Sequence, residues 1–480
     1  MFMAHAINIP EAGIPEQVWS GAAGGVGLSP AISSLSLLCH TRQAGFRTQT
    51  QYDMTIVMTN HTKSVSTRPN GWLAKRALLF AAMAVTVFAL WPEKSFGVGF
   101  RIPNQDAAAI ARGNAFVATA DNPSAIYYNP AGISQLEGQH VQVGVLSYLG
   151  IKTYFEGAAG GDMETDFEVV PLPQLYYTYD LEDTPFTFGL GLYAPFGLGV
   201  EWPDEAPMHS FAIESRMMYL TLNPVVSWKP HPTFSIAAGP MFNYSKAKLK
   251  RGLGLAPLLG PPDIFEYEGD DFSFGFNAGA LWQPHEQWSF GVNYRCSGSM
   301  EYDGDAEYNS VGLNSKVDAT VRLPFPQIAS AGVSYRPTPK WNIEFNVDYT
   351  DWNTLNSLTF RGTRNLGLLP GDLSLQLDWK ESWYYEIGVT RYFEDGWYAS
   401  AGYFYCSETV PESTFSSGVP DTELHVGSIG FGRNGERWSW AVAAQIIAGP
   451  ERKVDSSPSA PSGTYQLIVP TVSFSVGRKF

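Results

Sequence analysis

The order of short and long connections constrains the fold of this chain most strongly. The short polar links are Leu181–Pro185, Lys229–Thr233, Gln283–Gln287, Arg336–Lys340, Phe393–Gly396 and Arg433–Glu436. The long connections are Gly157–Asp166, Glu201–Glu214, Arg251–Asp271, Asp303–Ser315, Thr354–Leu373, Thr409–Asp421 and Pro450–Gly463. Strict alternation of the two kinds predicts about fourteen antiparallel strands, with the short turns at one end and the long loops at the other. Outer-membrane barrels are built in this way, whereas a soluble sandwich does not sort its connections by length.

The segments between these connections show the period of a β-strand. In Trp288–Asp303 the apolar residues Trp288, Phe290, Val292, Tyr294, Cys296 and Met300 alternate with polar ones. Trp341–Tyr349 repeats the pattern, again with aromatic residues at the ends and aliphatic residues between them. Successive side chains of a strand point to opposite faces, so each segment is expected to face lipid on one side. We therefore expect an all-β fold, a transmembrane antiparallel β-barrel of about 14 strands.

Composition narrows the classes of function. Of the 480 residues, 14% are aromatic and only 16% are charged, which favours strands over helical domains. The formal net charge of −15 argues against a nucleic-acid partner, which requires a basic surface. Three widely spaced cysteines are too few for a disulfide framework and unlike a metal site, so we expect no metal and no cofactor.

Residues 1–97 read as an upstream extension followed by an export signal. Lys75-Arg76 precede the apolar run Ala77–Trp91, and small residues suitable for cleavage end at Gly97. A transmembrane helix needs roughly 20 apolar residues, so this run is short for one. The mature chain is expected to begin at Val98.

Residues 98–138 resemble neither the signal nor a strand. Within Ala111–Leu136, Gly113 and the two steps Asn122-Pro123 and Asn129-Pro130 predict short helical turns. A compact plug inside the barrel and an ordinary capped N-terminal segment both fit this local pattern. The expected division is thus an upstream extension with a signal peptide at residues 1–97, a plug segment at 98–138 and a barrel at 139–480.

Several motifs in order resemble the FadL/TodX family of outer-membrane transporters for long-chain fatty acids and other hydrophobic molecules. They are Val98–Phe100, Asn129-Pro130-Ala131, Tyr193–Trp202 (YAPFGLGVEW), Phe274–Trp282 (FGFNAGALW), Asp348–Trp352 (DYTDW) and Gly388–Tyr392. The resemblance spans nearly all of residues 98–480. It implies a fourteen-stranded barrel closed by an N-terminal hatch, of which Asn129, Pro130 and Ala131 would form the family's NPA motif.

The connection Arg251–Asp271 is unusually apolar for an external loop. It carries Leu253, Leu255, Leu258, Leu259, Ile264 and Phe265. An exposed apolar patch usually marks a binding surface, so we expect this loop to capture an apolar ligand, although it could instead fold inward and pack on itself. In the resembled family the equivalent loop helps to form the groove that admits hydrophobic substrate.

The resemblance also implies an inner substrate site near Phe100 and Arg251. Arg251 aligns with a basic residue that pairs with the substrate carboxylate in the family, but it could equally serve solvation of the strand end or contact with lipopolysaccharide. The family's second basic group has no clear counterpart, because the region near Leu375 is apolar. Fatty acids and uncharged hydrocarbons both remain open as substrates.

The third predicted strand is interrupted at Ala194, Pro195, Phe196 and Gly197. Proline cannot donate to a ladder and glycine permits a bend, so the wall is expected to open here unless the interruption is a harmless bulge. In the family this position is a kink that forms a lateral window.

No enzyme signature is convincing in this sequence. His285-Glu286 lacks the second histidine of a zinc-protease motif, and Gly430–Gly435 matches a dinucleotide fingerprint but opens no helix. We expect passive uptake of hydrophobic molecules, by a monomer in contact with outer-membrane lipid. The alternatives are an aromatic-hydrocarbon or general porin-like channel and, less in keeping with the motifs, an outer-membrane hydrolase.

Overall fold

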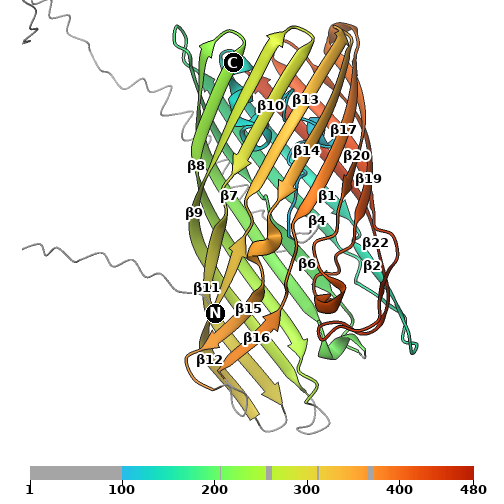
Figure 1. Ribbon diagram of the computed structural model, residues 1–480. Helices are drawn as coiled ribbons and strands as arrows, with labels where there is room; N and C mark the ends of the chain where they lie inside the picture. Colours follow the sequence, from blue (N-terminus) through green and yellow to red (C-terminus); the bar gives the residue numbers. More distant parts are fainter. Residues whose placement is uncertain (1–99, 206, 256–261, 311–312, 366–370) are drawn as a thin grey trace, which may run out of the picture. The chain divides into compact units, whose positions relative to one another are not determined.

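The computed structural model describes residues 100–480, except 206, 256–261, 311–312 and 366–370 (Figure 1). The expectations for residues 1–97, and those for Leu258 and Leu259, lie outside the described residues. Within them, nearly all strands join one antiparallel sheet that closes on itself. Closure is made by the first and last wall strands, which pair from His140↔Lys479 to Tyr148↔Thr471.

Fourteen wall strands make up this sheet in the described part of the chain, and several consist of two consecutive pieces. In chain order they are β1 (Gln139–Leu149) with β2 (Lys152–Gly157), β4 (Val169–Asp180), β5 (Phe186–Tyr193) with β6 (Gly197–Glu201), β7 (Glu214–His231), β8 (Phe234–Gly252), β9 (Ile264–His285), β10 (Trp288–Arg295) with β11 (Gly298–Ser310), β12 (Leu313–Phe325) with β13 (Ile328–Thr338), β14 (Trp341–Thr350) with β15 (Ser357–Gly362), β16 (Asp372–Gln376) with β17 (Ser382–Tyr392), β18 (Trp397–Cys406), β19 (Leu424–Asn434), β20 (Trp438–Ala448) and β22 (Gly463–Lys479). The short strands β3 (Met163–Glu164) and β21 (Arg452–Val454) lie in long connections. The predicted fourteen-stranded barrel is confirmed.

All six predicted short turns are confirmed, but three of the predicted long loops are wrong in extent. β8 and β9 stay paired as far as Gly252↔Ile264, and β11 and β12 as far as Ser310↔Leu313. The connection 354–373 likewise contains most of the β15–β16 hairpin. These hairpins extend to the lower end of Figure 1, where the long connections lie.

The reason for the error is the polar outer face of these extensions. Lys316 Nζ lies 3.1 Å from Asp305 and 2.7 Å from Glu307 across the β11–β12 pair. The spanning strands place apolar residues outward, so a segment with outward charges resembles a loop in the sequence. They mark strands that continue beyond the lipid, where an outward charge costs little, whereas at the bilayer midplane it costs about 2–4 kcal/mol.

Within the spanning part the predicted alternation is confirmed. Trp288, Phe290 and Val292 are exposed on the outer surface, while Asn342 and Glu344 of β14 are fully buried on the inner one. One predicted detail is wrong: Met300 does not share the outer face with Trp288 but is buried inside the barrel. The strand is broken after β10, and the inward positions change from odd to even numbers across the break.

The N-terminal segment, residues 100–138, forms short helical turns, of which the last two lie within the predicted range Ala111–Leu136. They are α2 (Ala107–Ile110), α3 (Ala125–Tyr128) and the 3-10 helix η1 (Pro130–Gln135). The segment is almost entirely buried and bonds to strands far apart in the wall, for example through Gly113 to Ser428 and through Ala118 to Glu344. The fit is close, because a Cβ at Gly402 would lie 2.0 Å from the backbone of Arg112.

Four further short elements lie in the connections. They are the 3-10 turns η2 (Met208–Ser210), η3 (Trp352–Thr354), η4 (Glu394–Gly396) and η5 (Glu412–Thr414). Within the described residues, no helix is both long and apolar enough to cross a membrane.

Candidate functional site

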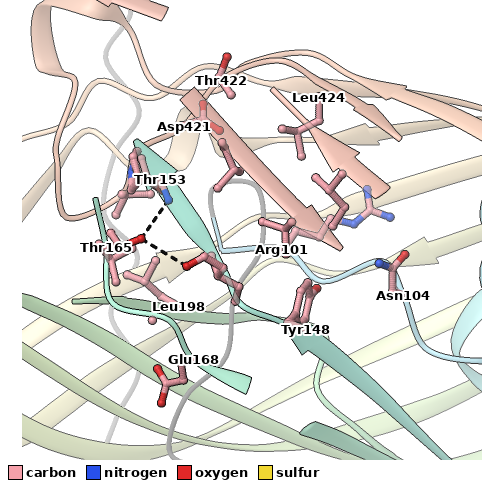
Figure 2. A pocket seen from close by; sticks show the side chains of 18 of the residues that line it. Arg101, Asn104, Tyr148, Thr153, Thr165, Glu168, Leu198, Asp421, Thr422 and Leu424 are labelled. Atoms are coloured by element: carbon pink, nitrogen blue, oxygen red, sulfur yellow. Dashed lines mark hydrogen bonds between the residues drawn. The ribbon is translucent and has the colours of Figure 1, made fainter. Parts of the chain in front are cut away.

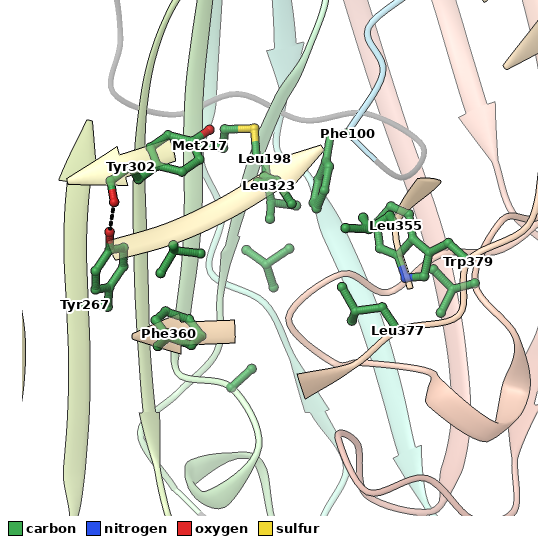
Figure 3. Packing of buried hydrophobic residues seen from close by; sticks show 14 of the residues in the cluster. Phe100, Leu198, Met217, Tyr267, Tyr302, Leu323, Leu355, Phe360, Leu377 and Trp379 are labelled. Atoms are coloured by element: carbon green, nitrogen blue, oxygen red, sulfur yellow. Dashed lines mark hydrogen bonds between the residues drawn. The ribbon is translucent and has the colours of Figure 1, made fainter. Parts of the chain in front are cut away.

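The barrel interior is apolar toward the long connections (Figure 3). We call this set of inward side chains the lumen cluster. It includes Phe100, Phe196, Leu198, Met217, Tyr219, Phe265, Tyr267, Tyr302, Leu323, Phe325, Trp352, Leu355, Phe360, Leu377 and Trp379. Barrel interiors are usually polar, so a lining of this kind offers dispersion contacts to an apolar molecule instead of water.

Phe100 joins the N-terminal segment to the lumen cluster. Its ring centroid lies 5.7 Å from that of Trp352, edge on, and 4.9 Å from that of Trp379. Such aromatic pairs add about 0.5–1.5 kcal/mol beyond the area they bury. The predicted role of Phe100 in substrate binding stays a prediction, and its place in the apolar lining is compatible with it.

The third wall strand is interrupted where the sequence predicted. β5 ends at Tyr193↔Thr221 and β6 resumes at Gly197↔Met218, so three residues stand opposite two of β7, as in a β-bulge. On the other side β5 pairs with β4 only up to Leu192↔Leu175, and β6 forms no ladder with β4 in the described residues. We call the resulting break in the wall, between β4 and Ala194–Glu201, the third-strand gap.

The N-terminal segment occupies the inner side of this gap. Ile102 N donates to Pro195 O over 2.8 Å, and Gly197 N donates to Phe100 O over 2.7 Å. Gln105 Nε2 donates to Ala194 O over 2.6 Å. The backbone groups of Ala194, Pro195 and Gly197 are therefore satisfied by a segment that is not part of the wall. Such groups would be costly if left unpaired in an apolar environment.

A pocket lies beside the third-strand gap (Figure 2). Tyr148 of the first strand, Leu198 of β6, Tyr384 of β17 and Leu424 of β19 contribute its apolar walls, and Arg101 lies at its inner end. A mostly apolar pocket with a few polar groups is the usual form of a small-molecule site.

The charge of Arg101 is already neutralised within the protein. Its guanidinium forms an ion pair with Asp348, Nη1 donates to Thr350 Oγ1 over 2.9 Å, and the group lies 4.4 Å from the centre of the Tyr384 ring. Arg101 is only 3% exposed. A ligand in this pocket therefore meets a cation that has its counter-ion, which favours an uncharged molecule over a carboxylate.

Arg251 lies elsewhere, at the outer end of β8. Its guanidinium donates to Ser210 O over 2.8 Å and is half-buried. It lines neither of the two pockets that Arg101 borders in the described residues. The structure thus does not bring Arg251 together with Phe100, and the role proposed for it in carboxylate binding stays a prediction.

The leucines of the predicted capture loop are less exposed than expected. Leu253 and Leu255 are half-buried and pack against the lumen cluster, and Asp263 accepts the N–H of Leu255. Ile264 and Phe265 belong to β9, where Phe265 points into the barrel. The described part of this connection is therefore an extension of the lumen lining at its mouth.

The NPA motif fixes the N-terminal segment to the wall. Asn129 Nδ2 donates to Val117 O and to Ala280 O over 2.9 and 3.0 Å, while its Oδ1 accepts the N–H of Ala131. Ala131 O accepts hydrogen bonds from two wall serines, Ser227 and Ser235. Pro130 opens η1, where its missing N–H costs nothing.

Sequence reasoning missed Arg295 as a candidate functional residue. It is 3% exposed and points inward from the end of β10. The signal was present, since a basic residue on the polar, inward face of a spanning strand must meet the interior. Among the residues that the structure describes, no group of acidic, histidine and cysteine side chains could hold a metal ion.

Comparison with known proteins agrees with this architecture. A family model described as "Outer membrane protein transport protein (OMPP1/FadL/TodX)" matches residues 89–450. The long-chain fatty acid transport protein of Escherichia coli O6:H1 is 23% identical over 386 residues, which cover 72% of this chain and 84% of that protein. A 47 kDa outer membrane protein of Pasteurella multocida is 21% identical over 388 residues, covering 75% and 89%.

Solved structures show the same fold. The crystal structure of a Pseudomonas aeruginosa FadL homologue matches with a TM-score of 0.70 at 19% identity, covering 80% of this chain and 100% of that one. The Pseudomonas putida toluene transporter TodX gives 0.65 at 16% identity with the same coverage. The family model covers most of the chain, which confirms the predicted resemblance. This chain therefore belongs to the OMPP1/FadL/TodX family of outer-membrane transport proteins.

Proposed function

We propose that this protein carries hydrophobic molecules passively through the outer membrane and releases them sideways into lipid. The observation that carries the proposal is the continuity between three features: the lumen cluster, the Arg101 pocket and the third-strand gap. Leu198 belongs to the lumen cluster and also lines the pocket and borders the gap. A molecule can thus remain in apolar surroundings from the mouth of the barrel to its wall.

Capture takes place at the mouth. Leu253 and Leu255 extend the lumen cluster toward the outside. In the sequence, Leu258 and Leu259 belong to the same connection. An apolar molecule that leaves water here gains about 0.8 kcal/mol per buried CH₂. Arg251 lies at the start of this connection, and we propose that it contacts an anionic group during capture.

The pocket then selects the substrate class. Relatives are named for long-chain fatty acids and for toluene, so both amphiphiles and aromatic hydrocarbons are within the family's range. Because Arg101 is paired with Asp348, the pocket itself favours uncharged parts of a molecule. This favours hydrocarbons, or the tail of a fatty acid whose carboxylate lies elsewhere.

Release requires displacement of residues Phe100–Ile102. Their backbone fills the third-strand gap by hydrogen bonds to Pro195 and Gly197, so a shift of this short segment opens the wall without unfolding a strand. The substrate enters the bilayer without crossing water. We propose that residues 98–138 act as the plug and 139–480 as the barrel, and that Asn129 anchors the plug.

The plug also distinguishes this function from a general porin, since a filled lumen opposes free diffusion. Transport is passive, by a monomer whose outward aromatic residues contact membrane lipid, without nucleic-acid partner, cofactor or catalysis. An aromatic-hydrocarbon channel is the second candidate, favoured by the neutralised Arg101.

Uptake by cells tests this function. A strain lacking the protein, complemented with the full chain, should accumulate labelled hexadecane, toluene or palmitate faster than the uncomplemented strain at limiting concentration. If the two strains accumulate each of the three compounds at the same rate, the proposed function is contradicted. A large steady ion conductance of the purified protein in planar bilayers would support the porin instead.

A further inference from the structure

The end of the barrel that carries the short turns has a cavity between the N-terminal segment and the wall. Its lining includes Ala108, Arg112 and Asn122 of the segment, and residues at the ends of β1, β17, β18, β20 and β22. The cavity measures about 250 Å³, whereas one water needs roughly 10–15 Å³ of such space. It therefore has room for a small solute that enters from the short turns, which face the periplasm in outer-membrane barrels.

Three basic residues form a row across neighbouring strands at this end. His140 of β1 stands opposite Lys479 of β22, and on the other side Lys479 N donates to Arg437 O over 2.9 Å. The buried positions of β22 from Val469 to Gly477 are odd-numbered, so Lys479 has the inward phase. All three basic residues line the cavity.

Basic residues with the outward phase at the same end have aromatic partners. The guanidinium carbons of Arg433 and Arg478 lie over tryptophan rings, 5.6 and 5.1 Å from the ring centres. In the part of the chain that the structure describes, the side chains of Arg437 and Lys479 have no hydrogen bond, ion pair or aromatic contact. Like charges opposite one another on a sheet are destabilising, and an anion between them would remove that cost.

Arg112 brings a further cation to the cavity from the N-terminal segment and is only 3% exposed. Its ion pair with Glu344 is long, 3.7 Å from Nη2, and its Nε and Nη2 have no hydrogen-bond partner in the described residues. Glu344 already accepts hydrogen bonds from Ala118 N and Thr119 Oγ1. A buried guanidinium with unused donors is costly, and an anion in the cavity would accept from them.

The cations of the cavity exceed its carboxylates by two. The lining holds three cations, Arg112, Arg437 and Lys479, and one carboxylate, that of Asp121. The partners of Arg112 and Asp121 outside the lining are one carboxylate and one cation, and these cancel. We propose that the cavity binds a small dianion of the phosphate type from the periplasm.

Phosphate suits these residues because a guanidinium can donate two parallel hydrogen bonds to it and a lysine can add a point charge. The phosphodiester of a membrane lipid carries a single charge and would neutralise half of the excess. The anion contacts Arg112 of the N-terminal segment together with Arg437 and Lys479 of the wall. It therefore stabilises the arrangement in which segment and wall are in contact. The site does not rest on the proposed transport function, because binding is measured on the purified protein.

Two pairs of variants test the site. The double variant Arg437→Gln, Lys479→Gln removes two inward cations, and the matched control Arg433→Gln, Arg478→Gln removes two outward ones at the same end. Both double variants have the same net charge, so only the face differs. Ala108→Glu places a carboxylate in the cavity, whereas Ala108→Gln places an uncharged group of the same size there. Heat-modifiable migration checks that each barrel is folded.

Binding of radiolabelled inorganic phosphate is measured by equilibrium dialysis in an uncharged detergent and a buffer without other multivalent anions. The wild type, the outward double variant and Ala108→Gln should bind phosphate with similar affinity. The inward double variant and Ala108→Glu should bind it roughly tenfold more weakly or worse, because charge-assisted hydrogen bonds are lost or opposed.

Competition identifies the chemistry of the ligand. Succinate, an extended dianion, should displace labelled phosphate less well than unlabelled phosphate does. Displacement by glycerol 3-phosphate would assign the site to phosphate esters, and its failure would assign the site to the free ion. Wild-type affinity in the folded inward double variant, an equal loss of affinity in the outward one, or equal displacement by succinate would overturn the proposal.

Discussion

The backbone N–H of Gly197 donates a 2.7 Å hydrogen bond to the carbonyl oxygen of Phe100. Gly197 opens β6, beyond the point where the third strand loses its pairing with β4, and Phe100 begins the described part of the N-terminal segment. The buried N-terminal segment thus also bonds to the wall at its break. In the proposed function, movement of a few residues changes access to the lumen and to the lipid together.

Loosening the anchor of the N-terminal segment should make the barrel leaky. Asn129→Ala removes the side-chain donors to Val117 O and Ala280 O, and each lost hydrogen bond costs about 0.5–1.5 kcal/mol. We expect a higher ion conductance in planar bilayers. Ser134→Ala, which loses one bond within the same turn, is the control and should conduct like the wild type. Equal conductance of the two variants would mean that Asn129 is no anchor.

The buried ion pair beside the pocket should be required for stability. Asp348→Asn leaves Arg101 without its counter-charge, which costs about 3–5 kcal/mol in a buried pair. Thr350→Val removes one hydrogen bond to the same guanidinium and should cost roughly 1 kcal/mol. The free energies of unfolding in urea, measured in lipid, should differ in this order. An equal loss of unfolding free energy in both variants would show that the Asp348 charge is not needed for stability.

The leucines at the mouth should matter for capture more than for assembly. Replacing Leu253 and Leu255 by Ser removes apolar contact from the mouth of the lumen cluster. Uptake of labelled hexadecane at limiting concentration should fall roughly tenfold, equivalent to about 1.4 kcal/mol of lost contact. Leu149→Ser, on the exposed outer face of β1, should leave uptake unchanged. If the double variant takes up hexadecane at the wild-type rate, the two leucines contribute to packing and not to capture.

The start of the mature protein sets the length of the segment that fills the third-strand gap. If the export signal ends at Gly97, two residues precede Phe100. Sequencing of the protein from purified outer membranes should then begin at or near Val98. Retention of Met1 or Met54 would contradict the predicted cleavage.

The sequence predicted the spanning strands well because lipid imposes a simple rule on them. Trp288 and Phe290 must face outward and Glu344 inward, whatever the rest of the chain does. The rule fails where the strands leave the lipid. There Lys316 and Asp305 face water from a strand, and their pattern is that of a loop. Met300 faces the other way for a local reason, since the strand is interrupted and the inward residues Arg295 and Met300 are an odd number of positions apart.

The candidate site was predicted in part. Pro195 and Gly197 revealed the interruption because proline cannot donate to a ladder. The partner that fills it, Phe100–Ile102, is about 95 residues away in sequence and no local pattern connects them. The closure of the barrel decides which side chains meet across the lumen. For this reason the contacts of Arg101, Arg295 and Asp348 could not be predicted from the sequence. The inner site expected for Arg251 rests on the family resemblance alone, and the residue lies at the outer end of β8.

Release through the third-strand gap is the central claim, and one comparison tests it most directly. Gly197→Arg places a bulky charged side chain in the gap, whereas Gly197→Ala adds one carbon at the same position. Both barrels should assemble, as heat-modifiable migration would show, because a charge lining an opening costs less than one facing lipid. The account predicts that uptake of labelled hexadecane by cells stops with Gly197→Arg and continues with Gly197→Ala, while binding by purified Gly197→Arg persists. A folded Gly197→Arg protein that transports hexadecane at the wild-type rate would contradict lateral release and place the exit through the barrel to the periplasm.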